Sequence, residues 1–235
     1  MRFVAVGELL VDVVADGSGH DAQIRLSPAG SALNAAVAAV AAGAEATVVG
    51  TVGDDPGGRM ILAELAARGV TAEVTVAEGT TGTFLLADGQ VRVDRGVAHE
   101  LVLPERIEAD AVLVSGYVAA AGEALSRADA AWVALDAARL SALPPGGNAV
   151  FASGPHHDVQ RLADGRRLAV VTLGARGAEA VLDGHLERIA PERTAADAPG
   201  SGDVFAATLL VALGRGADLA DALFEATRAA LDSLA

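Results

Sequence analysis

Two kinds of apolar stretch alternate along the first third of the chain, and this alternation restricts the fold more than any other feature. FVAVG (3–7) and TVVGTVG (47–53) have the length and the β-branched content of buried strands. GSALNAAVAAVAAG (30–43) and GGRMILAELAARGV (57–70) carry apolar residues at helical spacing and have a glycine at or near the end. Strands that alternate with helices predict a mostly parallel sheet with helices packed on it.

Two segments depart from this alternation. Residues 13–29 are largely polar and Gly-rich, and residues 72–97 resemble a series of short strands. The last two of these strands are joined by Asp88-Gly89, which is a common hairpin turn. We therefore predict that about 13–29 and 72–97 form a small β lid on the α/β body.

The alternation resumes after the lid segments and continues to the C-terminus. The expected later elements are strands at 111–116, 131–136, 149–153 and 168–174, a hairpin over 178–190, and helices at 201–213 and 218–233. There is no internal repeat and no low-complexity linker. Residues 1–235 are therefore predicted to form a single α/β domain.

Composition excludes several kinds of chemistry. The formal net charge of −14 argues against nucleic acid and acidic membranes as partners. The absence of cysteine excludes disulfides and thiolate sites, and every basic residue other than histidine is arginine, so no P-loop or Schiff-base lysine exists. The N-terminus has acidic residues inside its apolar stretch and predicts a strand instead of a signal peptide, so we expect a cytoplasmic protein.

The stretch AADAPGSGDVFAA (195–207) combines features that suit phosphoryl transfer. Gly200-Ser201-Gly202 precedes an apolar helix, whose N-terminal N–H groups can hold an anion. Asp203 lies in the first helical turn, where a carboxylate can accept the proton of an attacking hydroxyl. An ordinary capped helix would give the same pattern, so this stretch alone does not decide the function.

Three segments in order resemble the PfkB (ribokinase-like) family of carbohydrate kinases. Ala29-Gly30-Ser31 with Asn34, followed by GTVGDD (50–55), matches the family's N-terminal signature. VTLGARG (171–177) matches the nucleotide-side T-L-G-x-x-G loop, and DAPGSGD (197–203) matches the C-terminal signature D-T-T-G-A-G-D. The resemblance covers nearly the whole chain and implies a three-layer α/β/α fold with a β lid.

The resemblance assigns roles to particular residues. It implies that Asp203 is the catalytic base and that Gly200, Ser201 and Gly202 form the anion hole for the transferred phosphate. The acceptor-binding residues that it implies are Asp12, Gly30, Ser31 and Asn34, with Arg95 after the lid hairpin as a further candidate. Thr172, Gly174 and Gly177 match the nucleotide loop, and Asp197 matches a position that helps form a monovalent-cation site in several members. The family's cofactors are ATP and Mg²⁺, and its lid strands often pair two subunits into a homodimer.

Some family features are missing. The N-x-x-E segment that organises magnesium and phosphate is replaced by FASGPHHD (151–158), and neither Asn34 nor Asn148 is followed by a glutamate at the required spacing. Pro199 removes a backbone donor beside the anion hole. The chain is also shorter than typical members. These departures bear on metal handling, nucleotide affinity and turnover.

The sequence therefore favours an ATP-dependent kinase acting on a hydroxyl of a sugar or sugar-like molecule. The alternative is a catalytically impaired relative that binds a sugar or nucleoside without phosphorylating it. A dehydrogenase is a weaker hypothesis, because the first Gly-rich strand–helix turn lacks G-x-G-x-x-G. The acceptor stays open between ribose, fructose, a 2-keto-3-deoxy acid and a nucleoside.

Overall fold

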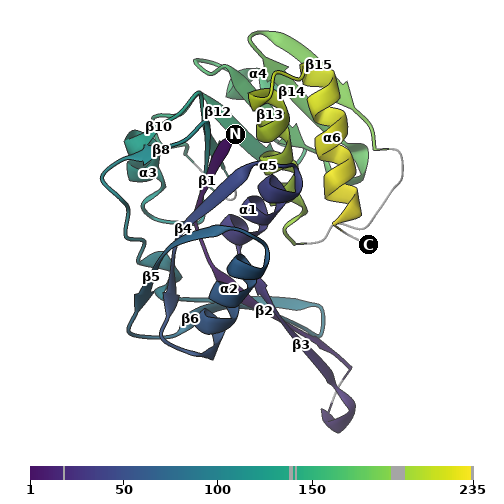
Figure 1. Cartoon of the computed structure of the whole chain (residues 1–235). Coiled ribbons are helices and arrows are strands. Elements are labelled where there is room, and N and C mark those ends of the chain that lie inside the picture. Colours follow the sequence, from purple (N-terminus) through teal and green to yellow (C-terminus); the bar gives the residue numbers. More distant parts are fainter. Residues whose placement is uncertain (18, 138–139, 141, 192–198, 234–235) are drawn as a thin grey trace.

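The computed structural model describes residues 1–17, 19–137, 140, 142–191 and 199–233. Within these residues the chain forms one large sheet with helices on both faces and a smaller four-stranded sheet that projects from it (Figure 1). A short two-stranded sheet pairs β8 (Ile107–Glu108) with β10 (Ala128–Asp129). The large sheet has the strand order β15-β14-β13-β12-β11-β9-β1-β4-β5. Its strands are β1 (Arg2–Val6), β4 (Glu45–Gly53), β5 (Thr71–Ala77), β9 (Ala111–Ser115), β11 (Trp132–Asp136), β12 (Ala149–Ser153), β13 (Leu168–Thr172), β14 (Ala178–Leu182) and β15 (His185–Ile189).

The strands from β13 to β5 in this order are paired in parallel, whereas β14 pairs antiparallel with both β13 and β15. The helices are α1 (Ser31–Ala41), α2 (Pro56–Ala67), α3 (Ala121–Arg127), α4 (Val159–Leu162), α5 (Ser201–Gly214) and α6 (Leu219–Asp232). The predicted three-layer α/β/α architecture is thus confirmed. None of the described helices combines the length and the apolar character that crossing a membrane requires.

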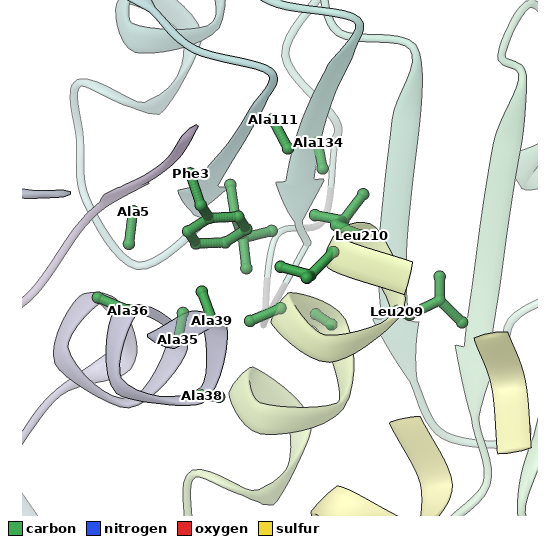
Figure 2. Close-up of a cluster of buried hydrophobic side chains, with 14 of the residues drawn as sticks. Phe3, Ala5, Ala35, Ala36, Ala38, Ala39, Ala111, Ala134, Leu209 and Leu210 are labelled. Carbon is green, nitrogen blue, oxygen red and sulfur yellow. The ribbon is translucent and has the colours of Figure 1, made fainter. Parts of the chain in front are cut away.

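The hydrophobic core lies on both faces of the large sheet, because its central strands are buried on both sides. Phe3 and Ala5 of β1 belong to the hydrophobic cluster that also contains α1, α5 and α6, whereas Val4 and Val6 point to the cluster under α3. Figure 2 shows Phe3 directed at the alanine-rich side of α1, with Leu210 of α5 nearby and Leu209 farther along the sheet. Small residues on α1 let the helix lie close to the sheet, and burying a side chain such as Phe3 contributes about 1.5–3 kcal/mol. Tight packing here fixes where the first turns of α1 and α5 lie.

The smaller sheet, called the small sheet below, has the order β3-β2-β6-β7. Its strands are β2 (Leu10–Asp16), β3 (Gln23–Ala29), β6 (Thr81–Ala87) and β7 (Gln90–Gly96). The structure corrects the predicted lid segments in two places. Residues 71–77 form β5, which pairs with β4 in the large sheet, and the first strand of the small sheet, β2, begins at Leu10 instead of about residue 13. The β5 sequence alternates polar and apolar residues because it is an exposed edge strand, and that pattern does not distinguish it from a lid strand.

Candidate active site

The first turn of α5 lies against the first turn of α1, beyond the carboxyl ends of the parallel strands. Gly200 precedes the helix with φ +88°, a left-handed conformation that favours glycine. Ser201, Gly202 and Asp203 form the first turn, so their N–H groups lie at the positive end of the helix dipole. The structure therefore combines a set of backbone donors and a carboxylate within four residues.

A hydrogen bond between distant parts of the chain orients this carboxylate. Asn34 Nδ2 donates to Asp203 Oδ2 at 3.0 Å. The same amide group lies against Gly200, where an added Cβ would come within 2.6 Å of Asn34 Nδ2. Gly200 is therefore required for two reasons: its own backbone conformation, and the close approach of the side chain that holds Asp203.

Gly30 plays the corresponding part at the start of α1. It has φ +108°, and an added Cβ would lie 2.3 Å from the Glu8 carbonyl oxygen. Ala32 N also donates to that carbonyl at 3.3 Å. The segment around Gly7, Glu8 and Leu9 therefore passes directly across the mouth of α1, which brings the Glu8 side chain into the site.

Asp203 has a strongly perturbed proton affinity. Burial raises the pKa of Asp203 well above its usual range, and the charges of Asp136 and Glu8 raise it further, while the hydrogen bond from Asn34 opposes the shift. A carboxylate with a raised pKa is a stronger base at neutral pH than an ordinary aspartate. Such perturbation is frequent where a carboxylate does chemistry.

Two carboxylates of this site were not predicted from the sequence. Asp136 ends β11, and Glu8 follows β1 between a glycine and a leucine. The signal that singled out Asp12, an aspartate near the end of an apolar strand, applies equally to Asp136. Glu8 stands as a charged residue inside an apolar run, which is a marker of a buried polar role.

The small sheet brings two predicted residues to one face. The strand register places Asp12 beside Phe84, and Phe84 opposite Val93, so Arg95, two residues further, points to the same side. Asp12 is half-buried, and burial raises its pKa. This face of the small sheet therefore carries the carboxylate and the cation that the sequence assigned to the acceptor.

Arg95 is held by other residues of the protein. Arg95 Nη1 lies 3.1 Å from Glu8 Oε1, and it also donates to the Tyr117 carbonyl. The guanidinium carbon lies 5.9 Å from the centroid of the Tyr117 ring, within the range of a cation–π contact. Burial raises the pKa of Glu8, although the charge of Arg95 opposes this. The pair connects the small sheet to the body of the protein.

A cavity with a volume of about 470 Å³ lies beside the first turn of α5. Ser201 and Gly202 form part of its wall, opposite the turn after β13. The predicted nucleotide residues Thr172, Gly174 and Gly177 all line it. The size is that of a small-molecule site. Asp197 lies outside the described residues.

The segment that replaces N-x-x-E contributes hydroxyls and imidazoles. Ser153 and Thr172 end neighbouring strands, and their hydroxyls are hydrogen-bonded at 2.7 Å. The rings of His156 and His157 are 4.1 Å apart, and burial together with the charge of His156 lowers the pKa of His157. Among the described residues, no three side chains of His, Asp or Glu are grouped so that they would hold a metal ion.

Comparison with known proteins gives a consistent result. The model of the family described as "pfkB family carbohydrate kinase" matches residues 2–142 and 151–231. Among curated proteins, no sequence matches this chain.

Several solved structures share the fold. One is adenosine kinase from Sinorhizobium meliloti, with a TM-score of 0.81 and 20% identity over 99% of this chain and 93% of that chain. Another is ribokinase from Thermotoga maritima, with a TM-score of 0.81 and 18% identity over 99% and 92% of the two chains. Ribokinase from Arabidopsis thaliana, solved with ribose and ATP, has a TM-score of 0.75 and 20% identity over 97% and 91%. With a family match over most of its length, this chain belongs to the pfkB family of carbohydrate kinases.

Proposed function

We propose that the protein transfers the γ-phosphoryl group of ATP to a hydroxyl of a sugar or sugar-like molecule. The observation that carries this proposal is the position of the first turn of α5. It separates the 470 Å³ cavity from the side of the site that holds Asn34, and Asp203 projects from the same turn. Phosphoryl transfer needs a base for the nucleophile and fixed donors for the transferred charge, and one helix turn supplies both.

In this proposal Asp203 takes the proton of the acceptor hydroxyl as the oxygen attacks. The N–H groups of residues 200–202 hold the transferred phosphate. Thr172, Gly174 and Gly177 bind the nucleotide in the cavity, while Asp12, Gly30, Ser31 and Arg95 surround the acceptor. Asn34 does more than bind the acceptor, because its amide fixes the carboxylate that acts as base.

Magnesium enters the proposal with the nucleotide. The described residues offer no group of three ligands, and Mg²⁺ is commonly held by substrate phosphates with few protein ligands and several waters. The chain has no lysine to balance the phosphate charge. Mg-ATP is therefore the substrate form that suits this site.

Charge around the acceptor side favours an acceptor without an acid group. Glu8, Asp12, Asp136 and Asp203 contribute carboxylates there, and the cation Arg95 is already paired with Glu8 at 3.1 Å. An anionic acceptor would meet repulsion without a free partner, whereas hydroxyls can donate to carboxylates. Among the acceptors left open by the sequence, neutral sugars and nucleosides are favoured over keto-deoxy acids.

The small sheet would act as a lid in this reaction. Closing it over the acceptor would exclude water and limit hydrolysis of ATP. A homodimer paired through this sheet also forms part of the proposal. Ile24 and Leu26 of β3 are each 61% exposed, which is unusual for large apolar side chains on a projecting sheet.

A second candidate function is ligand binding without phosphoryl transfer. The observation that favours it concerns Asn148. Its Oδ1 accepts a hydrogen bond from Val133 N and its Nδ2 donates to the Ala131 carbonyl, so this amide has a structural role. The segment FASGPHHD (151–158), which stands where the family usually organises metal and phosphate, offers the Ser153 hydroxyl and two histidines, while its carboxylate, Asp158, caps α4 by accepting from the backbone N–H groups of Gln160 and Arg161.

The test is ADP release from Mg-ATP across a panel of sugars, sugar acids and nucleosides, with Asp203→Asn in parallel. A positioned general base contributes roughly 10²–10⁴-fold, so the variant should lose at least about a hundredfold in kcat. Its melting temperature should still rise with nucleotide. If no acceptor stimulates the wild-type protein while ligands still stabilise it, the binding function replaces the kinase.

A further inference from the structure

A small cavity, lined by both apolar and polar residues, lies next to Asp203. It is enclosed by the ends of β1, β9 and β11 and by the first turns of α1 and α5. Its polar lining residues are Ser31, Ser115, Asp136 and Asp203. The centre of a water molecule can occupy about 10 Å³ within it, which is roughly the space that one bound water needs.

The walls of this cavity contain unused hydrogen-bonding capacity. Ser31 Oγ is buried and has no hydrogen-bond partner among the described residues. Ser115 Oγ accepts from Tyr117 N at 3.3 Å, so its own proton is still available to donate. Buried polar atoms are rarely left unsatisfied, and a water with several polar neighbours is the usual remedy.

Gly7 keeps this space open. A Cβ added at Gly7 would lie 2.6 Å from Ser115 Cβ and 3.1 Å from Ser31 Oγ. Asp136 pairs with Ser115 in the sheet, so its side chain emerges on the same face beside that hydroxyl. The two serines and the two carboxylates therefore lie near the carboxyl ends of β1 and β9. At this place the chain leaves β1 toward one face of the large sheet and leaves β9 toward the other face.

We propose that Asp136 is a positioning residue for the base, sharing the proton that Asp203 accepts through one water held by Ser31 and Ser115. This inference rests on the proposed kinase function for its catalytic meaning. Among the described residues, the charged groups that act on Asp203 are Asp136 from β11 and Glu8 from the β1–β2 connection, with Arg95 paired to Glu8. The α1 side contributes neutral Asn34.

The proton balance is complete within these groups. The acceptor O–H bond breaks, its electron pair forms the new O–P bond, and the proton passes to Asp203. The bond from the γ-phosphorus to the bridging oxygen breaks with its electrons on ADP. Asp203 then gives the proton to the cavity water, which passes one of its own protons to Asp136. Asp203 is thereby returned to its ionised form.

The second carboxylate has a clear physical effect on the first. Two nearby carboxylates resist being ionised together, so Asp136 strengthens the hold of Asp203 on a proton. A base must be ionised to act, so activity falls as the pH drops through the raised pKa of Asp203.

The experiment compares the pH dependence of kcat for wild type, Asp136→Asn and Asp110→Asn. Loss of the Asp136 charge should move the low-pH side of the kcat profile, called the acidic limb below, to lower pH by roughly one unit. It should also lower kcat near neutral pH, while KM for the acceptor changes little. Asp110 lies before β9, at the opposite end of the sheet, and its carboxylate accepts from Arg2 N at 2.7 Å. Its variant removes an equal charge and should leave the limb in place.

Ser115→Ala provides a test of opposite sign that keeps both carboxylates. Removing this donor should leave the carboxylate charge less solvated and move the acidic limb to higher pH. If Asp136→Asn fails to fold, this variant still decides the matter. A kcat loss in either variant with an unmoved limb would overturn the proposal.

Titration of the Asp203 carboxyl by ¹³C NMR separates this inference from the proposed function, because it needs no turnover. If wild type releases no ADP but the Asp203 titration still moves down in Asp136→Asn, the kinase fails and the coupling stands. If the titration does not move, the coupling fails whatever the activity.

Discussion

Gly200 illustrates how much of the site depends on single residues. Its φ of +88° would strain any side chain, and its missing Cβ leaves room for the Asn34 amide. An alanine there would push on the end of a flexible side chain, which can rotate away. The substitution would then weaken the Asn34–Asp203 hydrogen bond more than it would destabilise the fold.

We expect Gly200→Ala to lower kcat at least tenfold while destabilising the protein by only about 1–2 kcal/mol. Gly216→Ala is the matched control, because Gly216 also has φ +88° but an added Cβ would meet nothing within 4 Å. Steady-state kinetics and urea unfolding of both variants measure the two effects. Equal kcat in the two variants would show that the Asn34 contact does not matter.

At the level of elements, Asp55 ties the small sheet to the body. It caps α2 by accepting from Gly58 N at 2.7 Å, and it also accepts from Thr81 N at 2.8 Å at the start of β6. Although burial opposes it, the hydrogen bonds from Thr81 and Gly58 hold the pKa of Asp55 below its ordinary value. The second aspartate of the GTVGDD segment is therefore structural.

Asp55→Ala should lower the free energy of unfolding by about 1–2 kcal/mol at neutral pH. A depressed pKa means that this stabilisation is full above the unfolded-state pKa, about 3.9, and is lost as the pH falls through the lower folded-state value. The difference in free energy of unfolding between the variant and wild type should thus shrink in urea titrations as the pH falls below about 3.9. Asp54→Ala is the control, since the Asp54 side chain is 81% exposed. A difference that persists unchanged at low pH would contradict this account.

At the level of the whole molecule, the exposed apolar residues of β3 suggest how two copies would meet. Leu26 pairs with Val13 and Ile24 with Ala15 across β2 and β3, so they share one face of the small sheet. Burying such a face against a second copy would remove apolar surface from water.

We expect the wild-type protein to sediment as a dimer and Leu26→Asp to sediment as a monomer. Val102→Asp is the control, because Val102 is equally exposed, at 61%, but lies outside the small sheet. A wild-type monomer at micromolar concentration, or a dimer that survives Leu26→Asp, would rule out this interface.

The sequence predicted most elements of the fold because its periodicities are local and strong. The strand at 3–7, the helix at 30–43 and the final hairpin and helices all lie where expected within a few residues. The partner of β5 could not be predicted, since strand pairing depends on residues far along the chain. The same limit applies to the contacts of Arg95, because its pairing with Glu8 and with the Tyr117 carbonyl could not be predicted from the sequence.

The hydrogen bond from Asn34 to Asp203 has a further consequence for how the protein is made. Its two residues are separated by 169 positions, and the helix that carries Asp203 follows every described strand of the large and small sheets. Domains gain their non-local contacts only once both partners are available. A nascent chain that has completed α1, the large sheet and the small sheet still lacks Asp203, so Asn34 meets its partner only after the last described strand, β15, has been made.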